Sequence, residues 1–304
     1  MKRAFAFAAV VALLATPAFA QVADHYMGNM QIKHGIDMAT GQVTRGAGGC
    51  ATAGGGPGGT DPINPWYDNA DSTSFLGSGL TQGPSAVISG NRLTRMLMDE
   101  VHGDPIKGGL AISCIEFTMG NFNTDPVTVR PRIRYWFADG AAGGGNDPNP
   151  GTYYNKATPA ATSIGFTFGA ITVAANTCLT VFSTGFDTAF AFQWLTPDAA
   201  DGNVMWAGLT YDDNTGATGA TAAQMDNMGQ CLYDPPVVGS SHEEVFITNA
   251  AGSFFNVANP AGTIVAPGFK QPPFNLGLSF YVIPEPMTLS LLGLGAAALL
   301  RRRR

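Results

Sequence analysis

Charged side chains are scarce in this chain, at 12% of its 304 residues, and they are unevenly distributed. Of the 16 Lys and Arg residues, two lie near the N-terminus and four at the C-terminus, which leaves 10 in the body against 21 of the 22 acidic residues, a net charge near −11. Such an acidic body lacks the basic clusters that neutralise phosphates, which argues against a nucleic-acid partner. The absence of a Gly-X-Y period and of internal repeats argues against a collagen, a solenoid and a propeller.

The sequence also lacks the local motifs of common hydrolases. No G-x-S-x-G occurs, and H-E-x-x-H is absent because Phe246 stands three residues after Glu243. No histidine stands beside a nucleophile motif; the four are His25, His34, His102 and His242. Glycoside hydrolysis needs two acids in one groove, and nothing in the sequence pairs the candidates, which are Glu116, Asp139, Asp187, Asp212 and Asp213. We therefore expect that the protein is not an enzyme.

The N-terminus has the three parts of a secretory signal peptide. Lys2 and Arg3 precede an apolar stretch over residues 4–15, and Ala18-Phe19-Ala20 is a small-x-small cleavage pattern. We predict a signal peptide over residues 1–20 and a mature chain that begins at Gln21. The apolar stretch is too short for a membrane-spanning helix.

The C-terminus carries an uncharged run, MTLSLLGLGAAALL, over residues 287–300, followed by Arg301, Arg302, Arg303 and Arg304. As an α-helix this run would span about 21 Å, less than the ~30 Å hydrocarbon core of a bilayer. The arginines would stay on the cytoplasmic side and stop transfer. We expect a transmembrane helix that pauses in the membrane briefly and does not anchor the chain durably.

Ile283-Pro284-Glu285-Pro286, the apolar run and the basic tail, in this order, resemble the PEP-CTERM sorting signal over residues 282–304. Family members commonly carry Val before the first Pro, where this chain has Ile283, a conservative difference. The resemblance implies export by the secretion machinery and cleavage near Pro284, Glu285 and Pro286 by an exosortase, a membrane-embedded cysteine protease. It also implies transient membrane association, then delivery to the cell surface or extracellular polysaccharide matrix of a Gram-negative-type bacterium. A simple hydrophobic anchor is the alternative.

Four cysteines are present: Cys50, Cys114, Cys178 and Cys231. They lack the short C-x₂₋₄-C spacing of zinc sites, and an even number in an exported chain indicates two disulfides. Three pairings are open, and the spacing does not choose between them. Cys50–Cys114 with Cys178–Cys231 is favoured only because each pair closes a shorter loop.

Period-two alternation predicts strands along much of the chain. Val127–Phe137 alternates, with Arg130, Arg132, Arg134 and Trp136 on one face, and Pro131 in mid-run predicts an edge strand or a break. Further predicted strands are Ala111–Thr118, Ile164–Val173, Leu179–Phe182, Ala189–Leu195, Val204–Thr210, Glu244–Thr248 and Phe274–Val282. The segment Asn91–His102 fits either a helix or a strand, and only the all-β context favours the strand.

Two regions depart from this pattern. Thr221–Met228 is a predicted short helix, and residues 21–85 show little periodicity, with a flexible Gly-rich stretch at Arg45–Thr60. We predict an all-β fold: a jelly-roll-like β-sandwich over residues 21–281 with Gly/Asp/Asn-rich loops and at most one short helix. Hydrophobic targeting helices would lie at the N- and C-terminal ends.

Two binding sites are conceivable. Asp212, Asp213 and Asn214 gather oxygen ligands that suit calcium, although the EF-hand pattern fails at Ala223 and such residues are also ordinary turn formers. Trp136 could stack on a sugar ring, or its face could pack beneath a second layer with arginine stems covering the ring.

Taken together, the sequence predicts an exported cell-surface or extracellular-matrix protein with a non-catalytic structural or interaction role. The alternative is a carbohydrate-binding module that binds extracellular polysaccharide, with calcium as an assisting cation.

Overall fold

The structure, a computed structural model, describes part of the chain. The described residues are 25–26, 30–46, 48–50, 64–81, 83, 86–88, 91–93, 95–104, 111–136, 139–142, 157–159, 163–184, 204–212, 219–241, 245–248, 262–265 and 275–283. The predicted signal peptide, the predicted strand at 189–195 and all residues from Pro284 onward lie outside them.

One of the two main sheets has eleven strands, with β10 (Val127–Trp136), β16 (Val204–Asp212) and β8 (Leu97–His102) side by side at its centre. Its other strands are β1 (His25–Tyr26), β6 (Ala86–Ile88), β7 (Asn91–Leu93), β13 (Ser163–Thr167), β14 (Ile171–Val173), β18 (Ser240–Ser241), β19 (Val245–Thr248) and β20 (Gly262–Val265). The pairings are antiparallel except that of β1 with β13.

The other main sheet has nine strands around β9 (Ala111–Asn121), which lies between β15 (Thr177–Thr184) on one side and β22 (Leu278–Ile283) on the other. Its other strands are β2 (Gln31–Asp37), β3 (Val43–Arg45), β4 (Asn64–Asp68), β5 (Phe75–Thr81), β17 (Met228–Tyr233) and β21 (Asn275–Leu276). The remaining elements are the pair β11 (Asp139–Ala142) and β12 (Ala157–Pro159), a 3₁₀ turn at Ser72–Ser74, and the helix α1 (Ala222–Asp226).

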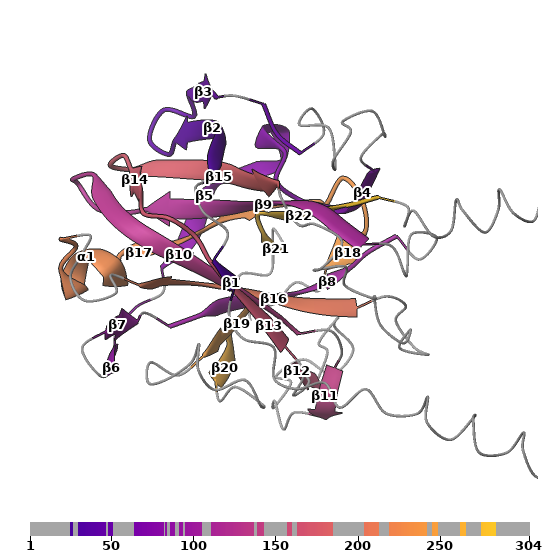
Figure 1. Ribbon diagram of the computed structural model, residues 1–304. Coiled ribbons are helices and arrows are strands. Elements are labelled where there is room, and N and C mark those ends of the chain that lie inside the picture. Colours follow the sequence, from indigo (N-terminus) through magenta and orange to yellow (C-terminus); the bar gives the residue numbers. More distant parts are fainter. Residues whose placement is uncertain are drawn as a thin grey trace, which may run out of the picture.

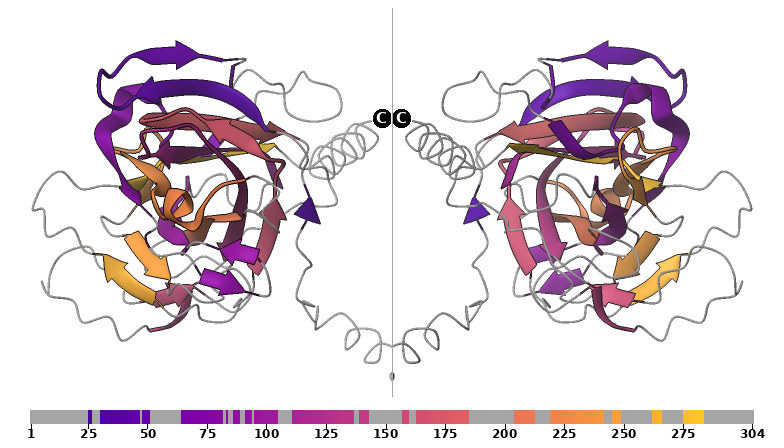
Figure 2. Two further views of the ribbon diagram at one scale, coloured as in Figure 1. Left: turned by 90° about the vertical axis from the view of Figure 1, so that its left-hand side faces the viewer. Right: turned by 90° about the vertical axis from the view of Figure 1, so that its right-hand side faces the viewer.

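The two sheets stack face to face, as Figures 1 and 2 show, with the main core between them. Alternate residues supply that core: Ile115 and Phe117 of β9 belong to it, whereas Cys114 and Glu116 point to the opposite face. Polar groups also cross between the sheets, since the Tyr211 hydroxyl donates to the carbonyl of Gly229 at 2.6 Å. The predicted all-β sandwich is therefore confirmed.

The nine-stranded sheet curls, so its outer face is also buried. Ile36 of β2 packs with Cys178 of β15 and with Cys231 and Tyr233 of β17, although β17 and β2 are separated by two strands in the sheet order. Figures 1 and 2 show β2 and β3 on the side of this sheet away from the main core. The edge of the sheet thus folds back over its own outer face and closes a second, smaller core.

The expectation of an edge or broken strand at Pro131 was wrong. β10 is continuous and has partners on both sides. Pro131 falls where one set of partners changes, because β14 pairs with residues 127–129 and β13 with residues 132–136. The carbonyl of Pro131 accepts a hydrogen bond from the amide of Phe168 beyond the end of β13. The missing N–H of proline therefore lies in a gap between two partner strands.

Two other local predictions are confirmed. The short helix expected within Thr221–Met228 is α1, and a capping box starts it: the Thr221 hydroxyl accepts from the amide of Gln224, whose side chain accepts from the amide of Thr221. The segment Asn91–His102 forms the two strands β7 and β8.

Both disulfides of the favoured pairing are present, Cys50–Cys114 and Cys178–Cys231, and all four cysteines are fully buried. Both lie on the outer face of the nine-stranded sheet. Cys178–Cys231 joins β15 to β17 across β9, and Cys50–Cys114 ties the segment after β3 to β9.

We predict that replacing Cys50 and Cys114 together by alanine lowers the free energy of unfolding by roughly 4 kcal/mol, because the bond closes a loop with a sequence separation of 64. Urea unfolding of the oxidised protein measures this change. The double alanine variant at Cys178 and Cys231, with a separation of 53, is the matched control and should lose a similar amount. A loss under 1 kcal/mol for either pair would contradict the loop-closure account.

Candidate functional site

The last strand of the body runs directly into the sorting segment predicted from the sequence. β22 ends at Ile283, the residue before Pro284, and it stays paired to its end. Val282 lies opposite Ile112 of β9 and Asn64 of β4, and Ile283 lies opposite Ala111 of β9. Ile283 therefore lies at the start of β9, whereas α1 lies near its end, since Met228 pairs with Asn121 (Figure 1). The described body leaves no spacer before Pro284.

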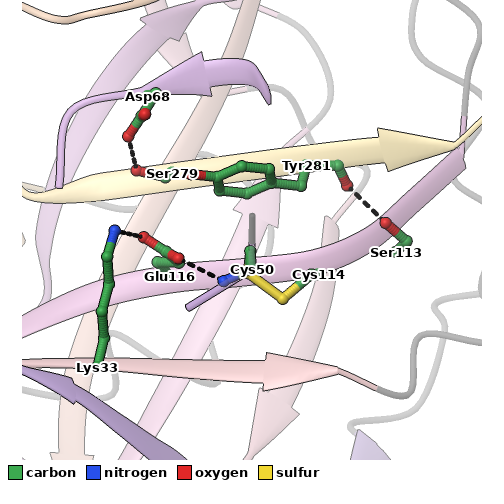
Figure 3. Close-up of a disulfide and its surroundings, with 8 residues drawn as sticks. All are labelled: Lys33, Cys50, Asp68, Ser113, Cys114, Glu116, Ser279 and Tyr281. Atoms are coloured by element: carbon green, nitrogen blue, oxygen red, sulfur yellow. Dashed lines mark hydrogen bonds and ion pairs between the residues drawn. A yellow bond between two sulfur atoms is a disulfide. The ribbon is translucent and has the colours of Figure 1, made fainter. Parts of the chain in front are cut away.

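Alternate side chains of β22 pack on the two faces of the nine-stranded sheet. Leu278, Phe280 and Val282 belong to the main core, and each is at most 1% exposed. On the outer face, Tyr281 packs with the Cys50–Cys114 disulfide, as Figure 3 shows, and its carbonyl accepts from the Ser113 hydroxyl at 3.2 Å. The Ser279 hydroxyl donates to Asp68 of β4 at 2.6 Å, which links β22 to its other neighbour.

A buried carboxylate lies beside this strand. The side chain of Glu116 is fully buried, and it accepts from Lys33 of β2 through one oxygen and from the backbone N–H of Cys50 through the other, at 2.7 Å (Figure 3). Burial raises the pKa of Glu116, and the nearby Lys33 and the Cys50 N–H oppose that rise. Lys33 and Glu116 are 83 residues apart in the sequence, so only the curl of the sheet brings them together.

Glycines let the chain approach this carboxylate closely. A Cβ on Gly49 would lie 2.6 Å from Oε1 of Glu116 and 2.9 Å from the Lys33 side chain, and Gly48 has φ 111°, where glycine is favoured. The start of the stretch that the sequence marks as flexible, up to Cys50, is thus packed over Glu116. Residues 51–63 lie outside the described part of the chain.

His34 lies next to Lys33 on the same strand. It is 5% exposed, and its Nε2 lies 2.9 Å from the Thr180 hydroxyl. Burial lowers the pKa of His34 to about 4; Lys33 and Arg45 act in the same direction, and Asp71 opposes them.

The sites proposed from the sequence are only partly described. Trp136 is the last residue of β10 and pairs with Trp206 of β16, and Asp212 ends β16 opposite Arg130. The side chains of Trp136 and Asp212 lie outside the described residues, as do Asp213, Asn214, Pro284, Glu285, Pro286 and the arginines 301–304. Two other aromatic residues, Trp66 and Tyr67, are fully buried in the main core, so their rings cannot stack on a sugar.

Sequence reasoning missed a polar group on the outer face of the eleven-stranded sheet. Glu100 and His102 of β8 are 1% and 7% exposed, with Nε2 of His102 3.1 Å from Oε1 of Glu100. Trp206 lies opposite Glu100, and Arg132 and Arg134 are also buried. The available signal was the alternation of charged and apolar residues in β10, which also fits a solvent-exposed face. β8 shows no such alternation, because Asp99 and Glu100 are adjacent.

Within the described residues, no group of three or more His, Cys, Asp or Glu side chains is placed to hold a metal ion. In that same part of the chain no helix is both long enough and apolar enough to cross a membrane. The transmembrane helix expected over residues 287–300 falls outside it.

Residues 282–304 match the family model of the PEP-CTERM protein-sorting motif. Neither the curated proteins nor the solved structures contain a match to the chain. The resemblance predicted from the sequence is therefore confirmed for these 23 residues. The motif marks an exported protein that is sorted to the cell envelope and processed by an exosortase during export.

We predict that Lys33→Met destabilises the protein by about 2 kcal/mol at pH 8 and by less at pH 4, because Glu116 loses its cationic partner and its pKa rises further. A carboxyl whose folded-state pKa exceeds its unfolded value loses stability as pH rises through that interval. Chemical unfolding at both pH values measures the effect, and Lys33→Arg, which keeps the charge, is the control. An equal loss at both pH values would contradict this assignment.

We predict the opposite pH dependence for His34. Its folded-state pKa is about 4 against 6.5 in the unfolded chain, so the unfolded state binds the proton first and stability is lost as pH falls from 6.5 to 4. Between pH 7 and pH 4 the wild type should lose about 3 kcal/mol more than His34→Gln. Parallel pH profiles for the two proteins would show that His34 is not the group responsible.

Proposed function

We propose that this protein is a non-catalytic component of the cell surface or extracellular matrix, delivered there by its PEP-CTERM segment. The observation that supports a structural role is the double burial of the nine-stranded sheet, which carries both disulfides on its outer face. A body constrained in this way is suited to a protein that must persist outside the cell, where disulfides are stable. Its role would be to present its acidic, Gly- and Asp-rich surface to other matrix components.

Removal of the sorting segment tests the delivery step. In a host that contains an exosortase, intact mass measurement of the mature protein should show a C-terminus that lacks Arg301–Arg304. Replacing Pro284, Glu285 and Pro286 together by alanine should leave the full-length chain in the membrane fraction. The control is alanine at Thr288 and Ser290, two polar positions of the adjacent run, which should leave processing unchanged. Normal release of the Pro284–Pro286 variant would argue against this route.

The second candidate function is carbohydrate binding. It would rest on Trp136 at the end of β10, whose ring could stack on a sugar face. Its register partner Trp206 is 1% exposed, so the ring of Trp206 is not part of such a site. Calcium at Asp212, Asp213 and Asn214 would assist as a second point of contact on a polysaccharide, because Asp212 lies six residues, roughly 20 Å, from Trp206 along β16.

Retention on immobilised extracellular polysaccharide distinguishes the two candidates. Carbohydrate binding predicts retention that falls at least tenfold in Trp136→Ala, and a calcium-assisted site predicts the same loss with EDTA or in the double variant Asp212→Asn/Asp213→Asn. A purely structural protein predicts no specific retention. Circular dichroism of each variant should match the wild type, so that a loss of retention is not a loss of folding.

A further inference from the structure

The residues that connect the body to its sorting segment belong to both. The matched motif begins at Val282, and Val282 is 1% exposed in the main core and paired on both sides. Ile283, the second matched residue, is still hydrogen-bonded within the sheet. The sorting motif therefore overlaps the folded body by two residues.

The connection to the apolar run is correspondingly short. Only Pro284, Glu285 and Pro286 separate Ile283 from Met287, the first residue of that run. Three fully extended residues span roughly 10 Å. While the apolar run is in the membrane, the end of the sandwich that contains the starts of β9 and β4 is held close to the bilayer and to any protease embedded in it.

A protease needs more room than this connection provides. Peptides commonly bind as an added extended strand whose backbone N–H and C=O groups pair with the enzyme. For a bond within or beside Pro284–Pro286, the residues on the N-terminal side include Tyr281, Val282 and Ile283. Tyr281 and Val282 already pair with both β9 and β4, and Ile283 pairs with β9, so Tyr281 and Val282 cannot add as a strand to an enzyme at the same time.

We propose that the end of β22 gates removal of the sorting segment: the protease acts on chains in which Tyr281–Ile283 have separated from β9 and β4. This inference rests on the proposed delivery route and adds a conformational requirement to it. The gate is a local opening of the kind that proteins undergo without unfolding globally. Contacts that hold the closed state are the packing of Tyr281 on the Cys50–Cys114 disulfide and the bond from the Ser113 hydroxyl to the Tyr281 carbonyl.

A designed disulfide tests the gate by locking the strand. Ile283 lies directly opposite Ala111, so Ala111→Cys/Ile283→Cys joins the two strands at their last pair, with the pairing verified by non-reducing peptide mapping. Oxidised, purified full-length precursor is incubated with membranes from an exosortase-containing host, and loss of the C-terminal segment is followed by mass. We expect the locked chain to be cleaved at least tenfold more slowly than the wild type.

A linker variant tests the gate in the opposite direction, because it should increase the rate of cleavage. Ten Gly and Ser residues inserted between Ile283 and Pro284 move the motif away from the sheet, so cleavage should be faster than in the wild type and should be restored in the locked chain. The same insertion in the exposed turn after Thr40 is the control and should leave the rate unchanged. The linker variant adds no cysteine, so it tests the gate even if the locked variant does not fold.

Three other outcomes would contradict either the gate or the sorting route. Equal cleavage of wild-type, locked and linker chains overturns the gate while leaving the sorting route intact. A locked chain that stays resistant after the linker is added also overturns the gate, because its defect then lies elsewhere. No cleavage of any chain, the linker variant included, overturns the sorting route itself.

Discussion

The burial of β9 on both faces is the constraint on which the rest of the structure depends. One face supplies Ile115, Phe117 and Met119 to the main core, and the other carries Cys114, Glu116 and Thr118 at no more than 1% exposure. A strand buried on both faces needs cover on both sides. The eleven-stranded sheet covers one, and the curled edge of its own sheet, together with the segment ending at Cys50, covers the other.

That second cover explains why a carboxylate can be buried in the middle of a sheet. An isolated charge in such a place is strongly disfavoured, whereas a paired and hydrogen-bonded one is tolerated. Glu116 has both Lys33 and the Cys50 N–H. The disulfide to Cys114 holds the donor segment two residues along the same strand, so the covalent bond and the charge pair support one arrangement. β22 packs against this arrangement through Tyr281.

Several parts of the fold could be predicted from neighbouring residues alone. The strands β9, β10 and β22 place apolar residues at every second position, β15 and β16 are short runs rich in apolar residues, and α1 has a capping box. β2 and β5 were missed. In β2 the side chains on the buried face include His34, and β5 contains two glycines, so neither shows the apolar alternation that identifies a strand. Pro131 was misjudged because its neighbours across the sheet, not along the chain, decide whether its missing N–H matters.

The sequence by itself determined that this is an exported all-β protein with a sorting segment at its C-terminus, because signal patterns and strand periodicity depend on residues close together in the chain. Only the tertiary structure decided which cysteines pair, that Lys33 meets Glu116, and that the last strand closes within one residue of Pro284. These outcomes depend on strand order and on the curl of the sheet, which bring together residues tens to hundreds of positions apart. No local pattern specifies that arrangement.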